Sequence, residues 1–148
     1  MKTKIILLER ILPIESSLRW RRVQDLYTFW DEKKNAPLIA VPSGSNYLIA
    51  DGHNRAAVLF LRGKDSVQAR VLETDEDISK CSDGALYKDG WDEGICTLDG
   101  FLGRYLSEWR PACVSKGIYS FRDLMSEKNV SVFVRGWFQR VMGDRDKR

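Results

Sequence analysis

The sequence is poor in the residues that build metal sites and disulfides. Its 148 residues include three cysteines, Cys81, Cys96 and Cys113, and a single histidine, His53. The cysteines are widely spaced and form no Cys-x-x-Cys pair, so the clustered ligands of a tetrahedral zinc site are missing. We therefore predict reduced cysteines that serve mainly in packing, and no metal site built from protein ligands alone.

A large net charge and long hydrophobic runs are also absent. With 24 basic and 21 acidic side chains the net charge is +3, which is too small to attract nucleic acid in general. An anion site must therefore be local, and DNA is not the favoured partner. The apolar run Ile5–Leu8 is broken by Glu9 and Arg10, well short of a signal peptide or a membrane span. The sequence predicts a cytoplasmic protein without a membrane partner.

The length and the hydrophobic content of 43% suit one domain around a single core. We divide the predicted domain 1–148 into a core (1–73), a connection in which charge and glycine rise (74–97), and a helical extension packed on the core (98–148). The predicted fold class is α+β, with a small mixed sheet flanked by helices. The C-terminal extension is helical in this prediction.

Periodicity and turn residues predict five elements in the core. A first strand over 4–12 should end at Pro13, and a helix capped by Ser16 follows with an apolar stripe. Turn residues between 38–41 and 47–50 predict a hairpin, and a helix over 56–62 should end at Gly63. Residues 66–72 alternate in polarity, as a half-buried strand does.

Helical spacing dominates the last third of the sequence. A helix over 98–109 has Thr97 as its cap and is predicted to end at Pro111. A second helix over 130–141 is predicted to end before Gly143, and a valine-rich strand over 130–134 is the alternative. We expect the tail from 144 to 148 to be frayed.

The segment Asp51-Gly52-His53-Asn54-Arg55 lies where a strand must turn sharply into a helix. Gly52 tolerates such a turn and the close approach of a ligand, and the amides at a helix start favour an anion. Arg55 offers a bidentate donor suited to phosphate, with His53 and Asn54 as shorter donors on the same turn. The alternative is a structural corner, in which Asp51 only caps the helix and Arg55 is solvated.

The stretch from Tyr47 to Gly63, together with Pro13-Ile14-Glu15, resembles the ParB/sulfiredoxin superfamily, and in its motif most closely the free serine kinases. Those kinases carry Asp-Gly-His-His-Arg after a strand and a Pro-x-Glu with a catalytic glutamate. The likeness spans residues 11–73. Asn54 departs from the kinase motif, and His53 stands where sulfiredoxins place a reactive cysteine, which argues against sulfinic-acid reduction.

The resemblance implies a nucleotide-binding protein that uses ATP or ADP with Mg²⁺, or CTP. Glu15, Asp51 and His53 are the implied catalytic residues, and Gly52, His53, Asn54 and Arg55 the implied nucleotide-binding residues. The reaction would be phosphoryl transfer to a small hydroxyl substrate such as free serine, with Glu15 accepting the proton. The alternatives are a nucleotide-dependent switch, a DNA-associated ParB-like module, or an adaptor with a structural corner.

Two further features have competing interpretations. Glu15 is functional if the entry to the first helix faces Gly52, and otherwise is an exposed acid near a helix start. The cluster Arg19, Arg21 and Arg22 could contact a nucleotide or a nucleic acid, but we favour the solvated face of an amphipathic helix.

Overall fold

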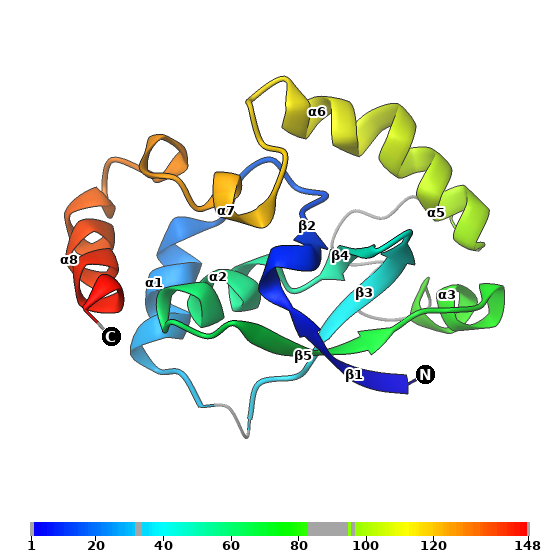
Figure 1. The fold of residues 1–148 in the computed structure, drawn as a ribbon, viewed down its shortest axis with the longest axis horizontal. Coiled ribbons are helices and arrows are strands. Elements are labelled where there is room, and N and C mark those ends of the chain that lie inside the picture. The colour runs from blue at the N-terminus through cyan, green and yellow to red at the C-terminus, as the bar shows by residue number, and fades with distance from the viewer. Residues whose placement is uncertain (1, 32–33, 83–94, 96, 148) are drawn as a thin grey trace.

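The computed structural model describes residues 2–31, 34–82, 95 and 97–147 (Figure 1). Five strands form one mixed sheet with the order β1-β5-β3-β4-β2. The fold class is α+β, as predicted. The predictions for Cys96 and for part of the connection over 74–97 lie outside the described residues, whereas the thiols of Cys81 and Cys113 are buried, as expected of packing residues.

The centre of the sheet follows the local sequence signals. Strands β3 (Leu38–Ser43) and β4 (Asn46–Asp51) form the predicted antiparallel hairpin. Helix α2 (His53–Leu61) follows, and Gly63 adopts a left-handed φ of 76° beyond its end. Strand β5 (Ser66–Val71) then pairs in parallel with β3. These elements confirm the predicted hairpin, helix and half-buried strand.

The single N-terminal strand predicted over 4–12 is wrong. The structure has β1 (Lys2–Leu7) at one sheet edge, a 3₁₀ turn (Leu8–Arg10), and β2 (Ile11–Leu12) at the other edge, parallel to β4. In a flat sheet these edges would lie ~19 Å apart, four strand spacings of ~4.8 Å. Four extended residue steps reach only ~14 Å, so the sheet must curl until the turn can join its edges.

Helices cover both faces of this curled sheet. Helices α1 (Trp20–Thr28), α2 and α8 (Arg135–Asp146) pack in one apolar cluster with Val67 and Ala69 of β5. Helices α3 (Asp75–Ser82) and α5 (Leu98–Arg104) belong to a second cluster with Leu48 and Ala50 of β4. Because Ile49 belongs to the first cluster, the two clusters lie on opposite faces of the sheet.

Two predictions between these elements need correction. Helix α1 begins at Trp20, not after Ser16, because residues 13–19 follow a non-helical path along the start of α2. Part of the predicted connection is helix α3. Thr74 caps this helix, because its Oγ1 accepts a hydrogen bond from the amide of Asp77. The Asp77 carboxylate accepts hydrogen bonds from the amides of Glu73 and Thr74, and these bonds lower the Asp77 pKa.

The C-terminal third is helical but divided differently from the prediction. Pro111 does not end the helix, because a π-helical turn (Tyr105–Trp109) leads into α6 (Arg110–Val114). The amide of Arg110 donates to the carbonyl of Tyr105, five residues back, so the π turn accommodates a proline that has no N–H of its own.

The final helix also differs from the prediction. The short helix α7 (Phe121–Leu124), with its Ser120–Asp123 capping box, and a 3₁₀ turn (Glu127–Asn129) were not predicted. Residues 132–134 form a turn, so the alternative strand over 130–134 is wrong and α8 starts only at Arg135. Helix α8 continues past Gly143 to Asp146, so the tail is not frayed there. None of the described helices is long and apolar enough to cross a membrane.

Candidate functional site

Strand β4 meets helix α2 at Gly52, which forms the predicted strand-to-helix corner. Gly52 has a φ of 109°, in the left-handed region. A Cβ at this position would lie 2.5 Å from Leu38 Cδ2 and 2.9 Å from Arg55 Nη2. Both the backbone conformation and the surrounding atoms therefore require glycine.

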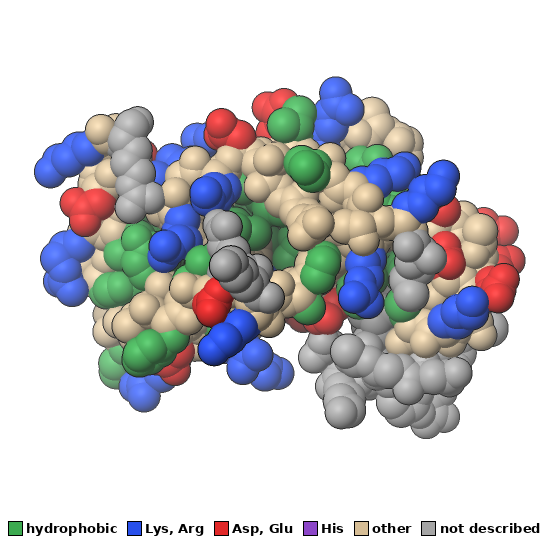
Figure 2. All heavy atoms as spheres, turned by 90° about the horizontal axis from the view of Figure 1, so that it is seen from below, with side chains coloured by type: hydrophobic (Ala, Val, Ile, Leu, Met, Phe, Trp, Pro, Cys, Tyr) green, Lys and Arg blue, Asp and Glu red, His purple; other side chains and the backbone are tan. Residues whose placement is uncertain are grey.

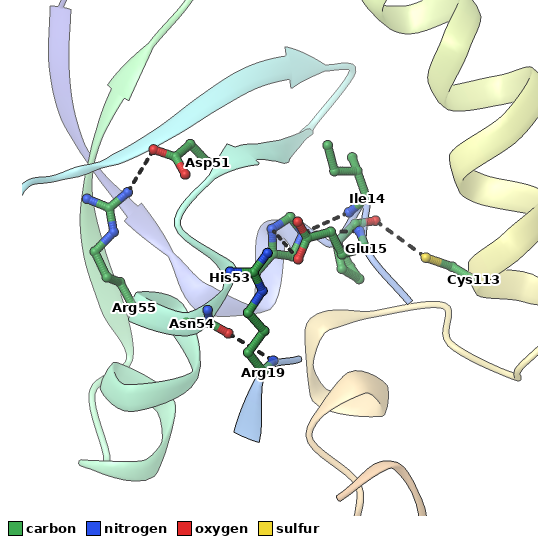
Figure 3. A network of polar contacts seen from close by, with 9 residues as sticks. Ile14, Glu15, Arg19, Asp51, His53, Asn54, Arg55 and Cys113 are labelled. Carbon is green, nitrogen blue, oxygen red and sulfur yellow. Dashed lines mark hydrogen bonds and ion pairs between the residues drawn. The ribbon is translucent and has the colours of Figure 1, made fainter. Parts of the chain in front are cut away.

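The guanidinium of Arg55 is held over this corner by three oxygen atoms. Its Nη1 donates to the carbonyls of Ala36 (2.9 Å) and Pro37 (3.2 Å), and its Nη2 donates to Asp51 Oδ2 (3.1 Å). Figure 3 shows the Asp51–Arg55 pair at one end of the network. Asp51 is therefore charge-compensated by Arg55, which weakens the repulsion between its carboxylate and an anion at the helix start.

His53 is buried and connects the start of α2 to the Pro13-Ile14-Glu15 segment (Figure 3). Its Nε2 accepts hydrogen bonds from the amides of Ile14 (3.0 Å) and Glu15 (3.2 Å). Burial lowers the pKa of His53 to about 3, so the ring is neutral at physiological pH and carries its proton on Nδ1. This proton faces the Glu15 carboxylate, whose Oε2 lies 3.7 Å from Nδ1. The geometry suits a positioning role for His53.

Asn54 connects the start of α2 to the start of α1. Its Oδ1 accepts a hydrogen bond from the amide of Arg19 at 3.4 Å, and Arg19 is the residue before α1. The contact lies at the surface, on the same side of α2 as His53 (Figure 3). Asn54 thus helps place the first turn of α1 next to the corner.

The corner opens into a cavity of about 600 Å³, here called the corner cavity. This volume lies within the range of ~300–1,000 Å³ that is common for small-molecule sites. One wall comes from the corner and the other from the segment that leads into α1. The lining residues are Glu15, Arg19, Arg22, Leu26, 34–36 and 50–55. The structure therefore brings Glu15 and the whole Asp51–Arg55 motif to one cavity.

Arg19 and Arg22 also line this cavity, although the sequence favoured a solvated face for them. Their spacing of three places them on the same side of α1. Arg21 instead lies over the ring of Phe133, 5.7 Å from its centroid, away from the corner cavity. The i, i+3 spacing was a usable signal, but the sequence did not show which side of α1 faces the motif.

A second cavity of about 420 Å³ lies beyond Glu15 and Arg19, here called the α6-side cavity. Both residues line it as well, together with Glu108 and Trp109 of the π turn. The nearby Cys113 thiol donates to the carbonyl of Pro13 at 3.9 Å (Figure 3), and burial raises its pKa. Glu15 therefore stands on the wall between two cavities.

The surface charges form no dominant basic patch on the face that Figure 2 shows. On the face shown in Figure 2, lysine and arginine side chains are scattered among acidic and apolar ones and do not form one dominant patch. Among the described residues, no group of three or more His, Cys, Asp or Glu side chains could hold a metal ion. A divalent cation would need oxygen atoms from a ligand in addition to those of the protein.

No protein-family model and no curated protein matched the sequence. A conserved hypothetical protein from Pyrococcus furiosus is 25% identical over 49% of the chain, with a TM-score of 0.43, and the chain covers only 33% of that structure.

Two other solved structures cover nearly the whole chain. A protein from Agrobacterium tumefaciens is 13% identical, with a TM-score of 0.44 over 99% of this chain and 91% of its own. The C-terminally truncated chromosome-partitioning protein ParB from Caulobacter crescentus, complexed with CTP-γ-S, is 14% identical, with a TM-score of 0.43 over 95% of this chain and 86% of its own. Similarity at these TM-scores does not establish a shared function.

Proposed function

We propose that the chain binds the phosphates of a nucleotide in the corner cavity. The observation that carries this proposal is the start of α2, which opens into a cavity also lined by Arg19 and Arg22. Gly52 precedes the helix and supplies no side-chain acceptor to the first-turn amides, so these amides suit an anion. Two arginines on the opposite wall add charged donors.

The arginines of the cavity have different roles in this proposal. Arg55 is engaged with Asp51 and with the carbonyls of residues 36 and 37, so it shapes the cavity and contributes charge from a fixed position. Arg19 and Arg22 are exposed on α1 and at its start, and they are placed to close on a phosphate. Phosphate binding thus involves residues outside the five-residue motif.

ATP, ADP or CTP is the proposed ligand, with Mg²⁺ as its counterion. Mg²⁺ is usually held by one or two carboxylates together with the phosphates of the ligand. Asp51 lines the cavity at the corner and is the carboxylate that fits this arrangement, with Glu15 on the opposite wall. When bound, the cation would neutralise phosphate charge.

Phosphoryl transfer is the proposed reaction, with Glu15 as the general base. Glu15 lines both the corner cavity and the α6-side cavity, so it lies between a bound nucleotide and a second ligand. A small hydroxyl substrate, such as free serine, would approach from the α6-side cavity. The hydroxyl oxygen of the substrate attacks the terminal phosphorus, its proton passes to Glu15, and the bond from that phosphorus to the bridging oxygen of the leaving nucleoside diphosphate or monophosphate breaks. Without turnover, the same binding site supports a nucleotide-dependent switch.

A thermal-shift panel of ATP, ADP, CTP and GTP with Mg²⁺ tests the binding proposal. A nucleotide at a hundred times its dissociation constant stabilises the folded state by ~2.7 kcal/mol. Arg22→Ala should remove most of the shift, because Arg22 lines the corner cavity. Arg21→Ala is the matched control, because the same helix carries Arg21 over Phe133. Equal shifts in both variants, or no shift with any nucleotide, would contradict nucleotide binding at this site.

A further inference from the structure

A smaller cavity of about 220 Å³ adjoins the corner cavity on the other side of Arg55. We call it the Trp30 cavity. The two cavities share Asn35, Ala36 and Arg55 as lining residues. Arg55 donates hydrogen bonds to the carbonyls of residues 36 and 37, and this contact forms the boundary between the two cavities. A ligand bound at the start of α2 therefore has a second compartment within reach.

The lining of the Trp30 cavity differs from that of its neighbour. Among the described residues that line it none is acidic, and Trp30, Pro37 and Leu59 give it an apolar wall. Its volume is below the range of ~300–1,000 Å³ for a whole drug-sized ligand and suits a single planar ring system. The indole Nε1 of Trp30 is buried and has no hydrogen-bond partner among the described residues. A ligand acceptor would remove that cost.

An unpaired strand edge supplies polar groups to the same cavity. Strand β1 pairs with all of β5, from Ser66 to Val71. In the described sheet, β3 pairs with β5 only from Ala69 onwards. Residues 66–68 line the cavity and have no ladder partner on the β3 side. Backbone amide and carbonyl groups at such an edge need partners, and heterocyclic bases present matching donors and acceptors along their edges.

We infer that the Trp30 cavity takes the heterocyclic base of the nucleotide whose phosphates lie in the corner cavity. Trp30 and Pro37 would contact the faces of the base, and the backbone of residues 66–68 would bond its edge. The inference rests on the proposed nucleotide binding and adds the position of the base. In this arrangement residues 35–37 and Arg55 lie between the base and the phosphates.

Calorimetric titration with a nucleoside triphosphate and with inorganic tripolyphosphate, both with Mg²⁺, separates the two compartments. The wild-type protein should bind the nucleotide ~5- to 150-fold more tightly than tripolyphosphate, since the base can stack on an aromatic ring. Trp30→Ala should remove this preference and leave tripolyphosphate binding unchanged. Trp137→Ala is the matched control, because both tryptophans are partly buried against the same apolar cluster.

A second variant covers the case in which Trp30→Ala does not fold. Leu59→Trp fills the Trp30 cavity instead of emptying it, and it should lower nucleotide affinity ~5-fold or more without changing tripolyphosphate affinity. Equal affinities of the wild-type protein for both ligands, or a preference that survives Trp30→Ala or Leu59→Trp, would overturn the position of the base and leave phosphate binding intact. If neither ligand binds the wild-type protein, phosphate binding itself is wrong, and the inference falls with it.

Discussion

The two walls of the corner cavity differ in how firmly their side chains are held. On the α2 wall, Arg55 donates to three oxygen atoms and His53 is only 4% exposed. On the opposite wall the side chain of Glu15 is 52% exposed, and Arg19 and Arg22 are exposed as well. The Asp51–Arg55 motif, which suggested the chemistry in the sequence, therefore serves largely to hold the site in shape. The side chains accessible to a ligand come mainly from the segment before and within α1.

Glu15→Gln gives the largest effect expected from the exposed wall. Glutamine keeps the shape of the side chain but cannot accept a proton, so phosphoryl transfer should fall by ~10²–10⁴ while nucleotide affinity stays nearly unchanged. Initial rates with small hydroxyl compounds and calorimetric titration measure the two quantities. Glu9→Gln, in the turn between β1 and β2, is the control. A wild-type protein that binds nucleotide but transfers no phosphoryl group would favour the switch.

Gly52→Ala tests the framework wall through stability. The new Cβ meets Leu38 and Arg55, and the residue must keep a φ of 109°. The left-handed conformation costs ~1–2 kcal/mol and the overpacking ~1–3 kcal/mol, so we expect a loss of ~2–5 kcal/mol in the free energy of unfolding. Gly143→Ala is the control. Gly143 lies within α8, and an added Cβ would meet no atom within 4 Å apart from its chain neighbours and the nearby backbone of its own helix, so the change should stabilise the protein by ~0.5–1 kcal/mol. Urea unfolding should show a lower free energy of unfolding than wild type for Gly52→Ala and a higher one for Gly143→Ala.

Arg55→Ala should lower both the stability of the fold and the affinity for nucleotide, whereas Arg22→Ala should lower only the affinity. Removal of the guanidinium leaves Asp51 and two carbonyls without this donor, so unfolding should become easier by ~1–3 kcal/mol. Nucleotide binding should weaken by ~1.5–3 kcal/mol through the lost charge and the released 36–37 segment. Denaturation and titration of the same samples separate the effects. Unchanged stability would show that the α2 wall is not the rigid one.

The smallest effect at neutral pH comes from the protonation of the buried histidine, and this effect grows as the pH falls. The folded pKa of His53 is lowered to about 3 from 6.5, so between these values the unfolded chain binds a proton that the folded chain does not. His53 therefore makes stability fall as the pH drops below about 6.5, by ~1.4 kcal/mol per pH unit. His53→Gln should flatten the dependence of unfolding free energy on pH between about 6.5 and 4. A slope equal to that of the wild-type protein would mean that His53 is protonated in the fold.

The sequence predicted well where its signals were local. The hairpin, α2 and β5 follow from turn residues, helix formers and alternating polarity within short windows. The corner at Gly52 was predicted from the same signals, since a glycine between a strand and a helix is typical of a sharp turn. Local signals therefore located one wall of the candidate site.

The other wall depends on contacts between distant segments. No local feature separates β2 from β1, because β2 is defined by its parallel pairing with β4, far along the chain. The late start of α1 likewise reflects contacts of residues 14, 15 and 19 with His53 and Asn54. The orientation of Arg19 and Arg22 toward the cavity follows from that placement, so sequence periodicity alone could not assign them to the site.

The π turn at Tyr105–Trp109 has an evolutionary consequence. A π turn equals one extra residue inserted into an α-helix, and each residue rotates a helix by about 100°. Deletion of the exposed Leu106 would remove this extra residue and rotate one part of the helical segment against the other, and it would leave Pro111 without the π turn that accommodates it. Either Glu108 and Trp109 would leave the wall of the α6-side cavity, or Cys113 would lose its contact with the carbonyl of Pro13. A lower melting temperature of this deletion variant would show that the stability of the fold depends on the extra residue. An insertion of one residue can thus create a cavity wall without changing any side chain in it.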